Sequence, residues 1–353
     1  MNNSPRSHAF GNSNDFSVAV VGATGAVGAE FIAILAASGI ALDRLRLFAS
    51  ERSAGRKITV GDREIAVEAL RPGCFAGVQV AFFSAGKGIS REWAPQAVAS
   101  GAWVIDNSSA FRMDPAVALI IPEVNPEVLD SITKPAIVAV PNCSTIVALV
   151  AATPLHRVAR VRRMTVATYQ AASGAGAAAM RELETQAHDF AGGRAMNTEI
   201  FGRQYLFNCF SHNSAIGPEG YNEEEVKLLY ETRKIWNDPA VRVAATCVRV
   251  PVLRAHCEAI GLEFETPLSE SEAREILRTA PGVEVVDDRI NNRFPEPLNA
   301  AGGDPVLVGR IRTDWSLDPG MGVQMFVAGD QIRIGAALTG WHIAELIGAR
   351  VAV

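Results

Sequence analysis

A glycine-rich turn between an apolar run and a helical pattern limits the possible fold of this chain more than any other feature. Residues 16–35 read FSVAVVGATGAVGAEFIAIL, with Gly22, Gly25 and Gly28 spaced as G-x-x-G-x-x-G. This order is typical of the first β-turn-α unit of a nucleotide-binding α/β sheet. Glycine permits the tight turn and lets the backbone approach a pyrophosphate, which the helix N-terminus then stabilises. The same glycines could serve only to pack a helix on a sheet, so the pattern alone leaves function open.

The segments that follow keep the alternation of strands and helices that a doubly wound parallel sheet requires. Apolar runs begin at about Leu45 and recur at residues 78–86 and 103–110, and the last two contain Ser, Gly or Asn at their ends. Polar and small residues are expected where parallel strands end beside a ligand crevice. Residues 89–101 supply a crossover helix between two of these runs. We therefore predict a Rossmann dinucleotide-binding domain over residues 15–142.

The second half of the chain has a different pattern of apolar and polar residues. Residues 240–266 alternate for a long stretch and predict antiparallel sheet, and residues 322–338 predict a late hairpin strand pair. We expect an α+β catalytic and dimerisation domain over residues 143–335. A C-terminal helix over residues 336–353 is expected to dock back on the Rossmann domain. Residues 1–14 are polar and predict a disordered leader.

Composition narrows the classes of partner and compartment. The net charge is −5 without a basic run, so nucleic acid and anionic membranes are not expected partners. The five cysteines are odd in number and scattered, without a C-x-x-C pair, which argues against disulfides and zinc and fits a reducing compartment. The histidines form no metal-binding motif, so no metal is expected. We predict a cytoplasmic protein.

The stretch AIVAVPNCSTIV, residues 136–147, passes from an apolar strand through Pro141 into a second apolar run. Asn142 suits a helix N-cap, so Cys143 is expected where a strand stops and a helix starts. The helix N-terminus and its free N–H groups favour a thiolate there. The alternative is that Cys143 is a small buried hydrophobic residue, as free cysteines often are.

The segment ASERSAG after the second strand bears on the choice of cofactor. An enzyme that uses NAD usually places an acidic residue at this strand end for the ribose hydroxyls. Here Ser50, Arg52 and Ser53 offer hydroxyls and a guanidinium, which suit the 2′-phosphate of NADP. Glu51 could itself take the acidic role, and Arg52 could be only a solvated surface charge.

Candidate partners for the cysteine lie in separate segments. Arg249 and His256 are seven residues apart, so an uninterrupted strand would turn them to opposite faces, whereas Pro251 favours an interruption of the strand. A lone histidine such as His256 is more often structural than catalytic. Gln170 lies near a strand end, where its amide could orient an acyl group or only satisfy loop backbone.

Two further segments carry charged candidates. Arg112, in DNSSAFR, lies just past a predicted strand end near the ligand crevice. Glu224 and Lys227, in NEEEVK, are one helical turn apart, and such a pair is usually an exposed ion pair.

Eight segments in the same order resemble the aspartate-β-semialdehyde dehydrogenase family, from about Phe16 to Leu346. They are GATGAVG, ASERSAG, DNSSAFRM, PNCST, YQAASGAG, NEEEVK, RVPVLRAH and PLNAAGGDPVLVGRIR. Any one could arise by chance, but their joint order is highly specific. The resemblance implies NADPH-dependent reduction of L-aspartyl-β-phosphate to L-aspartate-β-semialdehyde, in the biosynthesis of lysine, methionine, threonine and diaminopimelate.

The resemblance implies a role for each catalytic candidate. Cys143 matches the nucleophile that forms a thioacyl enzyme, and His256 matches the general acid/base. Gln170 matches the glutamine that positions the acyl intermediate. Asn142 matches the residue beside the nucleophile that helps to hold the substrate or its oxyanion.

The resemblance also assigns the charged groups of the substrate and the cofactor contacts. Arg249 matches the partner of the α-carboxylate, Glu224 the residue near the amino group, and Arg112 with Lys227 the phosphate-binding pair. Such a substrate explains two arginines and a lysine in an acidic protein. The expected contacts to NADP(H) are Gly22, Ala23, Thr24, Gly25, Ala26, Val27, Gly28, Ser50, Arg52, Ser53, Ser84 and Gly174.

The chain departs from the family near its C-terminus. One branch commonly reads GAALNxVQIAE where this chain reads GAALTGWHIAE, so Thr339 and His342 replace Asn and Gln. These side chains are expected near the cofactor, which puts the placement of the nicotinamide in question. Stacking by Trp341 could compensate.

Three rival functions stay open on sequence grounds. N-acetyl-γ-glutamyl-phosphate reductase uses the same thioacyl logic, but its nucleophile motif resembles Pro-Gly-Cys-Tyr-Pro, and its acetylated substrate needs no acidic partner such as Glu224. A CoA-thioester reductase is a weaker alternative, because Arg112 and Lys227 suit free phosphate. A non-catalytic NADP-binding paralogue would be favoured by loss of the catalytic groups, which are all present. The family resemblance further implies a homodimer or homotetramer.

Overall fold

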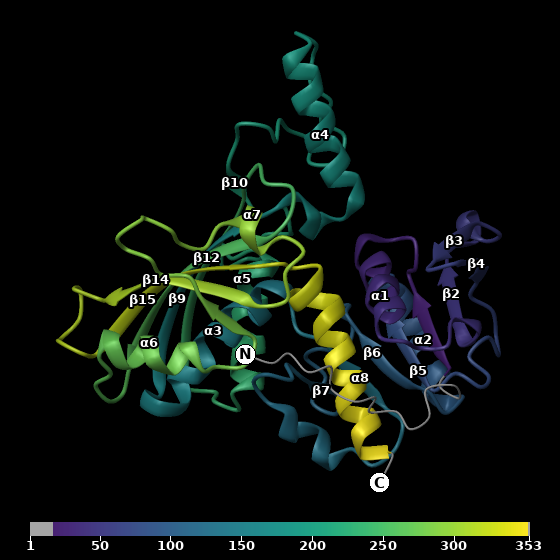
Figure 1. Ribbon diagram of the computed structural model, residues 1–353, viewed down its shortest axis with the longest axis horizontal. Coiled ribbons are helices and arrows are strands. Elements are labelled where there is room, and N and C mark those ends of the chain that lie inside the picture. Colours follow the sequence, from purple (N-terminus) through teal and green to yellow (C-terminus); the bar gives the residue numbers. More distant parts are fainter. Residues whose placement is uncertain (1–16, 352–353) are drawn as a thin grey trace. The chain divides into compact units, whose positions relative to one another are not determined.

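The computed structural model describes residues 17–351, and the predicted leader 1–14 lies outside the described residues. The chain divides into two compact units (Figure 1). The first unit runs to Pro141 and takes in the chain again from Ala336 onward. The second unit is Asn142–Gly335.

The first unit is built on a mainly parallel sheet of the predicted doubly wound kind. Strand β1 (Val18–Val21) is central and fully buried, and β2 (Leu45–Ala49) and β5 (Val80–Phe83) pair with it in parallel on its two sides. The strand order therefore reverses at β1, which is where such sheets bind ligands. The full order is β3-β4-β2-β1-β5-β6-β8-β7, with β3 Lys57–Val60, β4 Arg63–Ala69, β6 Trp103–Asp106, β7 Ala118–Leu119 and β8 Ile137–Ala139; only β3 and β4 pair antiparallel.

Helices cover both faces of this sheet because neighbouring strand residues point to opposite sides. Phe82 packs its ring 4.5 Å from that of Phe31 on α1 (Ala26–Ala37). Phe83 lies in the cluster that contains Ala94 of α2 (Lys87–Ala99). Short helical turns complete the unit: η2 Leu42–Arg44, η3 Glu51–Ser53 and η4 Pro126–Ser131.

The C-terminal helix α8 (Leu338–Val351) packs within the first unit. A Cβ at Gly340 would lie 2.7 Å from the ring of Phe31 and 3.4 Å from Ile105, so the helix approaches α1 and β6 closely at this glycine. The sequence therefore needs a residue without a side chain at this point of α8.

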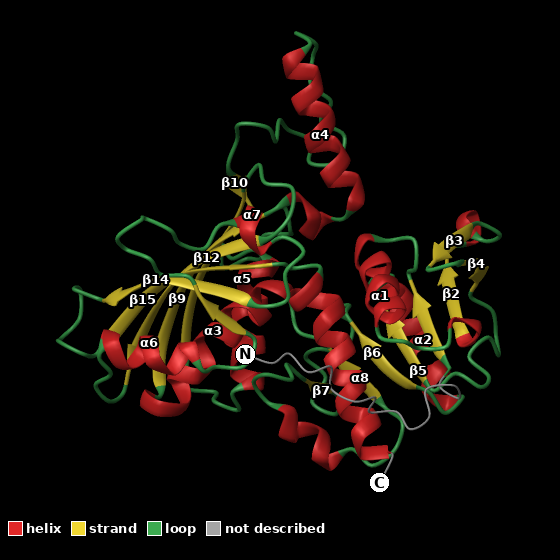
Figure 2. Cartoon of the chain, in the orientation of Figure 1, coloured by secondary structure: helices red, strands yellow, loops and turns green. Residues whose placement is uncertain are grey.

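The second unit has a seven-stranded mixed sheet of order β10-β11-β9-β12-β15-β14-β13 (Figure 2). Its strands are β9 Val161–Gln170, β10 Phe210–Ser211, β11 Arg242–Arg249, β12 His256–Phe264, β13 Val283–Val285, β14 Val306–Thr313 and β15 Gly322–Gly329. The prediction of purely antiparallel pairing over residues 240–266 is wrong in part. β11 and β12 do run in opposite directions, but β9 lies between them, parallel to β11 and antiparallel to β12.

The predicted hairpin over residues 322–338 is also wrong. β15 pairs with β14 and β12, and the chain after it turns into a π-helical segment, η6 (Arg333–Ala337). The carboxylate of Asp330 accepts from the backbone N–H of Ile332, and its carbonyl accepts from Gly335. These bonds fold the backbone into a turn and leave no second strand.

Helices α3 (Cys143–Ala159), α5 (Glu223–Ile235) and α6 (Glu270–Arg278) form a layer against this sheet. α3 contacts both other helices and is mostly buried. The capping box of Asn222 and Glu225 begins α5. Helix α4 (Ala177–Ala191) extends away from the sheet, and η5 (Ala172–Ala175) and α7 (Pro297–Ala300) are short (Figure 1).

No helix in the described range of residues 17–351 combines the length and apolar character that a bilayer crossing requires.

Candidate active site

Three neighbouring strands of the second unit bring Arg249, Gln170 and His256 into one row. Arg249, the last residue of β11, is paired with Gln170, the last residue of β9. On the other side of β9, Tyr169 is paired with Cys257, so His256 lies beside Gln170. Paired residues in a sheet share a face. The seven-residue spacing is therefore no obstacle, because Arg249 and His256 lie on different strands.

The segment between these strands is a loop that ends in an unusual backbone conformation. Residues 250–255 separate β11 from β12, and Ala255 has a φ of 74°. This left-handed conformation is disfavoured for a residue with a Cβ. Ala255 is held there by a bond from its N–H to Oε1 of Gln331, at 3.0 Å. The strained residue directly precedes His256 and sets where β12 begins.

Cys143 is the first residue of α3, as the sequence predicts. Its thiol therefore meets the partial positive charge of a helix N-terminus. It is partly buried, and a Cβ at Gly335 would lie 2.9 Å from its Cβ. Only glycine at position 335 allows this approach of the backbone to Cys143.

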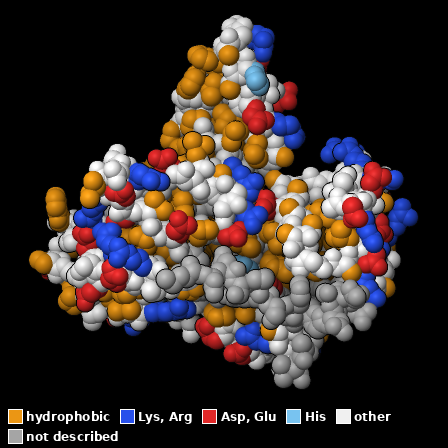
Figure 3. Space-filling model, in the orientation of Figure 1, with side chains coloured by type: hydrophobic (Ala, Val, Ile, Leu, Met, Phe, Trp, Pro, Cys, Tyr) orange, Lys and Arg blue, Asp and Glu red, His pale blue; other side chains and the backbone are white. Residues whose placement is uncertain are grey.

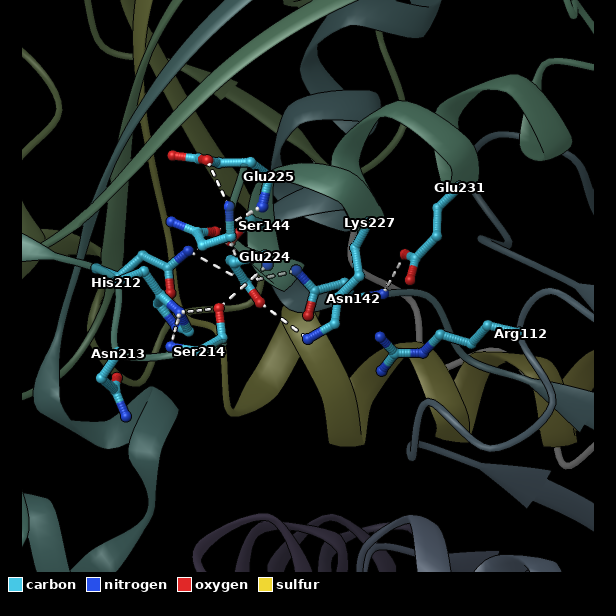
Figure 4. Close-up of polar contacts among 12 residues, drawn as sticks. Arg112, Asn142, Ser144, His212, Asn213, Ser214, Glu224, Glu225, Lys227 and Glu231 are labelled. Atoms are coloured by element: carbon cyan, nitrogen blue, oxygen red, sulfur yellow. Dashed lines mark hydrogen bonds and ion pairs between the residues drawn. The ribbon is translucent and has the colours of Figure 1, made fainter. Parts of the chain in front are cut away.

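Asn142 occupies the N-cap position of α3, but its side chain does not cap the helix. Its Nδ2 instead donates to Oε1 of Glu224 at 2.6 Å, and its backbone N–H donates to Oε2 of Glu231 at 2.6 Å (Figure 4). Two carboxylates of α5 therefore hold the residue that precedes Cys143.

Gln170 is joined to the same helix start. Its Nε2 donates to Oγ of Ser144 at 2.8 Å and to Oε1 of Glu224 at 3.1 Å. Ser144 follows Cys143 in the chain, so hydrogen bonds within the second unit connect the row on the sheet to the start of α3.

Glu224 and Lys227 are a partly buried ion pair, with Glu224 buried and Lys227 half-buried, rather than the exposed pair that their spacing usually indicates. Nζ of Lys227 lies 3.1 Å from Oε2 of Glu224, whose side chain is 5% exposed (Figure 4). Burial alone would raise the pKa of Glu224, but Lys227, His212 and the bond from Asn142 hold that pKa well below its usual range. Glu224 is thus a carboxylate in a site lined by donors.

His256 is completely buried with a fixed tautomer. The N–H of Ala171 donates to its Nδ1 at 3.0 Å, so the proton of the neutral ring is on Nε2. Burial, together with the charge of Arg249, lowers the pKa of His256 to about 3. Nε2 has no hydrogen-bond partner among the described residues. The site therefore presents a buried N–H that can serve a ligand.

Arg249 is held by three neutral acceptors. Its Nε donates to Oδ1 of Asn213 at 3.1 Å, its Nη1 to the carbonyl of Ala171 at 3.1 Å, and its Nη2 contacts Nε2 of His212 at 2.8 Å. A guanidinium has five N–H groups. With these partners among residues 17–351, one N–H on each terminal nitrogen remains for a ligand, which is what two-pronged binding of a carboxylate requires.

Arg249 interacts electrostatically with Cys143. Burial lowers the pKa of Arg249, and its electrostatic interactions with Tyr205, Glu224 and Cys143 oppose that effect. The guanidinium remains positive and favours negative charge at Cys143.

Gly174 lies against the row of site residues. A Cβ at this position would be 2.9 Å from Nε2 of His256 and 3.0 Å from Nη1 of Arg249. The resemblance assigns Gly174 to cofactor binding. In the second unit, the lack of a side chain at Gly174 leaves room for His256 and Arg249.

Arg112 belongs to the first unit, where it is buried at the carboxyl ends of two strands. Its Nε donates to the carbonyl of Val140 after β8, at 2.9 Å, and its Nη2 to the carbonyl of Asn107 after β6, at 2.8 Å. Val140 is three residues before Cys143 in the chain.

The glycine turn of the first unit has the form that a pyrophosphate requires. Gly22 has a φ of 94°, and a Cβ there would lie 2.7 Å from the carbonyl of Ser84; a Cβ at Gly28 would lie 2.2 Å from the carbonyl of Gly22. Gly25 is the N-cap of α1 and has no side chain to cap it, so the N–H groups of the first turn are left for a ligand. Thr24 and Ala26 lie in this turn, and Ala23 and Val27 flank them.

Buried polar atoms at the ends of the neighbouring strands also fit a cofactor. Oγ of Ser84 and both side-chain polar atoms of Asn107 are buried without a hydrogen-bond partner in the described part of the chain. Ser50, Arg52 and Ser53 follow β2, the other neighbour of β1, and Ser50 and Arg52 are exposed there. These residues fit a dinucleotide that crosses the carboxyl edge of the sheet.

Thr339 and His342, the two residues near the C-terminus that differ from the family pattern, have different surroundings. Thr339 is buried in α8. Nδ1 of His342 lies 2.9 Å from Oε1 of Glu123, an ion pair within the first unit when the ring is protonated. Oε2 of Glu123 is buried without a partner among residues 17–351.

Sequence reasoning missed five residues that the structure places at these sites. Glu231 is two helical turns from Glu224 on α5, so its spacing could have indicated it. Ser144 directly follows Cys143, which the sequence did single out. The others carry no signal of their own in the sequence: Asn107, His212 and Gly335.

Two family models match the chain, one for each unit. Residues 17–132 match the semialdehyde dehydrogenase NAD binding domain, and residues 153–334 match the semialdehyde dehydrogenase dimerisation domain. The aspartate-semialdehyde dehydrogenase of Aquifex aeolicus is 47% identical over 334 residues, which cover 94% of this chain and 98% of that protein.

Solved structures agree with the sequence comparison. Aspartate semialdehyde dehydrogenase II of Vibrio cholerae, complexed with ASA, superposes with a TM-score of 0.90 at 39% identity, covering 94% of this chain and 98% of that one. The aspartate semialdehyde dehydrogenase of Candida albicans with NADP gives a TM-score of 0.75 at 26% identity, covering 96% of this chain and 100% of that one.

Proposed function

The chain belongs to the semialdehyde dehydrogenase family, and on that premise we propose that it reduces L-aspartyl-β-phosphate to L-aspartate-β-semialdehyde with NADPH and releases phosphate. It is an NAD(P)-dependent oxidoreductase of amino-acid biosynthesis, on the pathway to lysine, methionine, threonine and diaminopimelate. The observation that carries the proposal is the row of Arg249, Gln170 and His256, joined by hydrogen bonds to the start of the helix that bears Cys143.

Covalent catalysis begins at Cys143. The thiolate attacks the acyl carbon, the carbon–sulfur bond forms, and the carbon–oxygen bond to phosphate breaks with its electron pair leaving on phosphate. When bound, the nicotinamide cofactor supplies a hydride to the resulting thioester. Collapse of the thiohemiacetal oxyanion releases the aldehyde and returns the thiolate. The departing phosphate takes up one proton to become hydrogen phosphate, so the reduction consumes one proton overall.

His256 suits the oxyanions of both steps. With Nδ1 accepting from Ala171, the neutral ring presents Nε2–H to the oxygen on which negative charge develops. Gln170 and Asn142 keep the acyl group and the start of α3 in place, since both side chains are bonded to Glu224.

The charged groups of the substrate have matching partners. Arg249 offers one N–H on each terminal nitrogen to the α-carboxylate, and Glu224 is a buried carboxylate for the α-ammonium. Arg112 and Lys227 are proposed to bind the phosphate that leaves.

NADP is the proposed cofactor. The glycine turn Gly22–Gly28 would hold the pyrophosphate, and Ser84 would meet the cofactor at the next strand end. Ser50, Arg52 and Ser53 would receive the 2′-phosphate, and the related Candida albicans enzyme is solved with NADP. Thr339 and His342 are proposed near the nicotinamide.

A homodimer or homotetramer is proposed for the assembly, supported by the match to a dimerisation domain. Phe190 and Phe207 are 55% and 67% exposed and pack edge to face with their ring centres 4.9 Å apart. Figure 3 shows hydrophobic side chains gathered on the part of the second unit that carries α4. The cytoplasm is the proposed compartment, since the five cysteines, all of which lie within residues 17–351, form no disulfide there.

The test mixes purified protein with aspartate semialdehyde, phosphate and NADP and follows the absorbance of reduced cofactor. Phosphate-dependent turnover that is lost in Cys143→Ser is expected, with NADP binding retained in the variant. Parallel runs use NAD and N-acetylglutamate semialdehyde. Turnover of the acetylated aldehyde alone would assign the chain to the rival reductase. Binding of NADP without turnover of either aldehyde would make it a non-catalytic paralogue.

A further inference from the structure

We propose that His212 is a positioning residue that fixes the guanidinium of Arg249 for the substrate carboxylate. The inference rests on the proposed function, which gives Arg249 that substrate group. His212 follows β10, whose Phe210 is paired with Arg249 on β11. Its backbone N–H donates to the carbonyl of Cys247 at 2.8 Å, and its side chain is buried. Backbone pairing therefore places the imidazole beside the guanidinium.

The contact with Arg249 decides the tautomer of His212. Nη2 of Arg249 lies 2.8 Å from Nε2 of the imidazole, and an arginine nitrogen can only donate. Nε2 must therefore accept, and the ring proton is on Nδ1, which donates to Oγ of Ser214 at 3.0 Å. The N–H of Ser214 lies 3.2 Å from Nδ1 and would suit the other tautomer, but that tautomer would set two donors 2.8 Å apart at Arg249.

The imidazole stays uncharged beside the arginine at neutral pH. Burial and the charge of Arg249 lower the pKa of His212 to about 4, although Glu224 opposes them. A carboxylate in this place would orient the guanidinium and also neutralise it. A neutral acceptor orients it and leaves its charge for the substrate. The other two acceptors on Arg249, Asn213 Oδ1 and the carbonyl of Ala171, are also neutral.

The same contacts extend to the proposed ammonium site. Oγ of Ser214, which accepts from His212, also accepts from the backbone N–H of Glu224 at 3.3 Å (Figure 4). His212 and Ser214 thus connect Arg249 with the first turn of the helix that carries Glu224. The geometry of this connection would set the separation of the two groups that bind the α-carbon substituents.

The kinetic test compares His212→Leu with His212→Gln, because Oε1 of glutamine can accept from Arg249 in place of Nε2. We expect His212→Leu to raise the KM for aspartate semialdehyde about 10- to 100-fold, with kcat changed less than about threefold. His212→Gln should restore KM to within about fivefold of the wild-type value. With 3-aminopropanal, which lacks the α-carboxylate, the variants and the wild type should differ little.

Several outcomes would overturn the proposal. One is an equal loss with both aldehydes, and another is no recovery in His212→Gln although its thermal unfolding matches the wild type. A third readout needs no activity: ¹⁵N NMR of histidine-labelled protein at pH 7, with the His212 signal assigned through the Gln variant. We expect the imidazole of His212 to be protonated on Nδ1 and unprotonated on Nε2. A proton on Nε2 instead would contradict the inference. Absence of wild-type turnover would instead count against the proposed function.

Discussion

At the scale of single residues, the site depends on a glycine as much as on its charged groups. A side chain at position 174 would clash, because its Cβ would lie too close to Nε2 of His256 and to Nη1 of Arg249. We expect Gly174→Ala to lower kcat/KM for aspartate semialdehyde about tenfold or more, since small displacements of positioned groups cost large factors in rate. Steady-state kinetics measure this effect.

Gly88→Ala is the matched control, because a Cβ at Gly88 on α2 meets open space. It should leave kcat/KM unchanged and add up to about 1 kcal/mol of helix stability. Unchanged kinetics in Gly174→Ala would show that the side chains of His256 and Arg249 adjust without cost.

Single residues also show what the sequence could reveal of the site. Cys143 and Gln170 stand at ends of elements, and local patterns place both there. His212 has no such pattern, because its role depends on a strand pairing that joins Phe210 to Arg249 across 39 residues of sequence. The side-chain bonds of Asn142 were unpredictable for the same reason, since its partners lie on α5.

At the scale of elements, helix α5 supplies three site residues: Glu224, Lys227 and Glu231. Its capping box is closed by Oδ1 of Asn222 at 3.0 Å from the N–H of Glu225. We expect Asn222→Ala to cost about 1 kcal/mol of unfolding free energy. Because the loosened first turn includes Glu224, the KM for aspartate semialdehyde should rise as well. Urea unfolding and kinetics measure the two effects.

The comparable variant is Ser269→Ala, which removes the capping box of α6, a helix without site residues. It should lose similar stability and keep the KM. A rise in KM in both variants would mean that global loosening, rather than α5, is responsible.

Elements also mark the limit of pattern reasoning for the fold. The glycine turn and the alternation of the first half predict the doubly wound sheet, because each unit of that sheet is local in sequence. The alternation of residues 240–266 predicts strands but cannot reveal that β9, about 80 residues earlier, lies between them. The false hairpin at residues 322–338 fails because the bonds of Asp330 outweigh the alternation.

At the scale of the whole molecule, a buried acid gives the stability a pH dependence. Both carboxyl oxygens of Glu258 are buried without a hydrogen-bond partner in the described residues, and burial, with a contribution from Glu224, raises its pKa well above the usual value. Protonation of Glu258 therefore contributes fully to the free energy of unfolding below about pH 4.5, the usual pKa of glutamate. This contribution is lost as the pH rises through the raised pKa of the folded state. Glu258→Gln should therefore be the more stable protein at neutral pH.

The advantage of Glu258→Gln is expected to grow by up to about 1.4 kcal/mol per pH unit above pH 4.5, while the folded-state acid stays protonated. Urea unfolding at pH 5, 6, 7 and 8 measures it, and exposed Glu284→Gln is the control. A difference that does not change with pH would contradict the argument.

The rates at which a thiol reagent modifies the cysteines depend on how well the fold excludes solvent from each of them. Burial is the main cause of the raised pKa values of two thiols, Cys247 and Cys257, and the pKa of Cys257 reaches about 12. By contrast, Cys209 is exposed and Cys143 is partly exposed. A thiol reagent at pH 8 should modify Cys209 and Cys143 about 100-fold or more faster than the two buried thiols. Mass spectrometry of peptides measures the rates.

Inactivation should follow Cys143, so that Cys209→Ser is inactivated as fast as the wild type. Rapid labelling of Cys247 in the native protein would mean that β11 opens readily.

The first unit is made of two stretches of chain, and Gly340 in the later one packs against Phe31 and Ile105 in the earlier one. During synthesis the sheet of the first unit therefore emerges long before the helix that covers it. At 5–20 residues per second, the ribosome needs about 10–40 s to make residues 142–335 between the two stretches. For that time the apolar surface around Phe31 and Ile105 lacks α8, and the nascent chain offers it to chaperones or to other nascent chains.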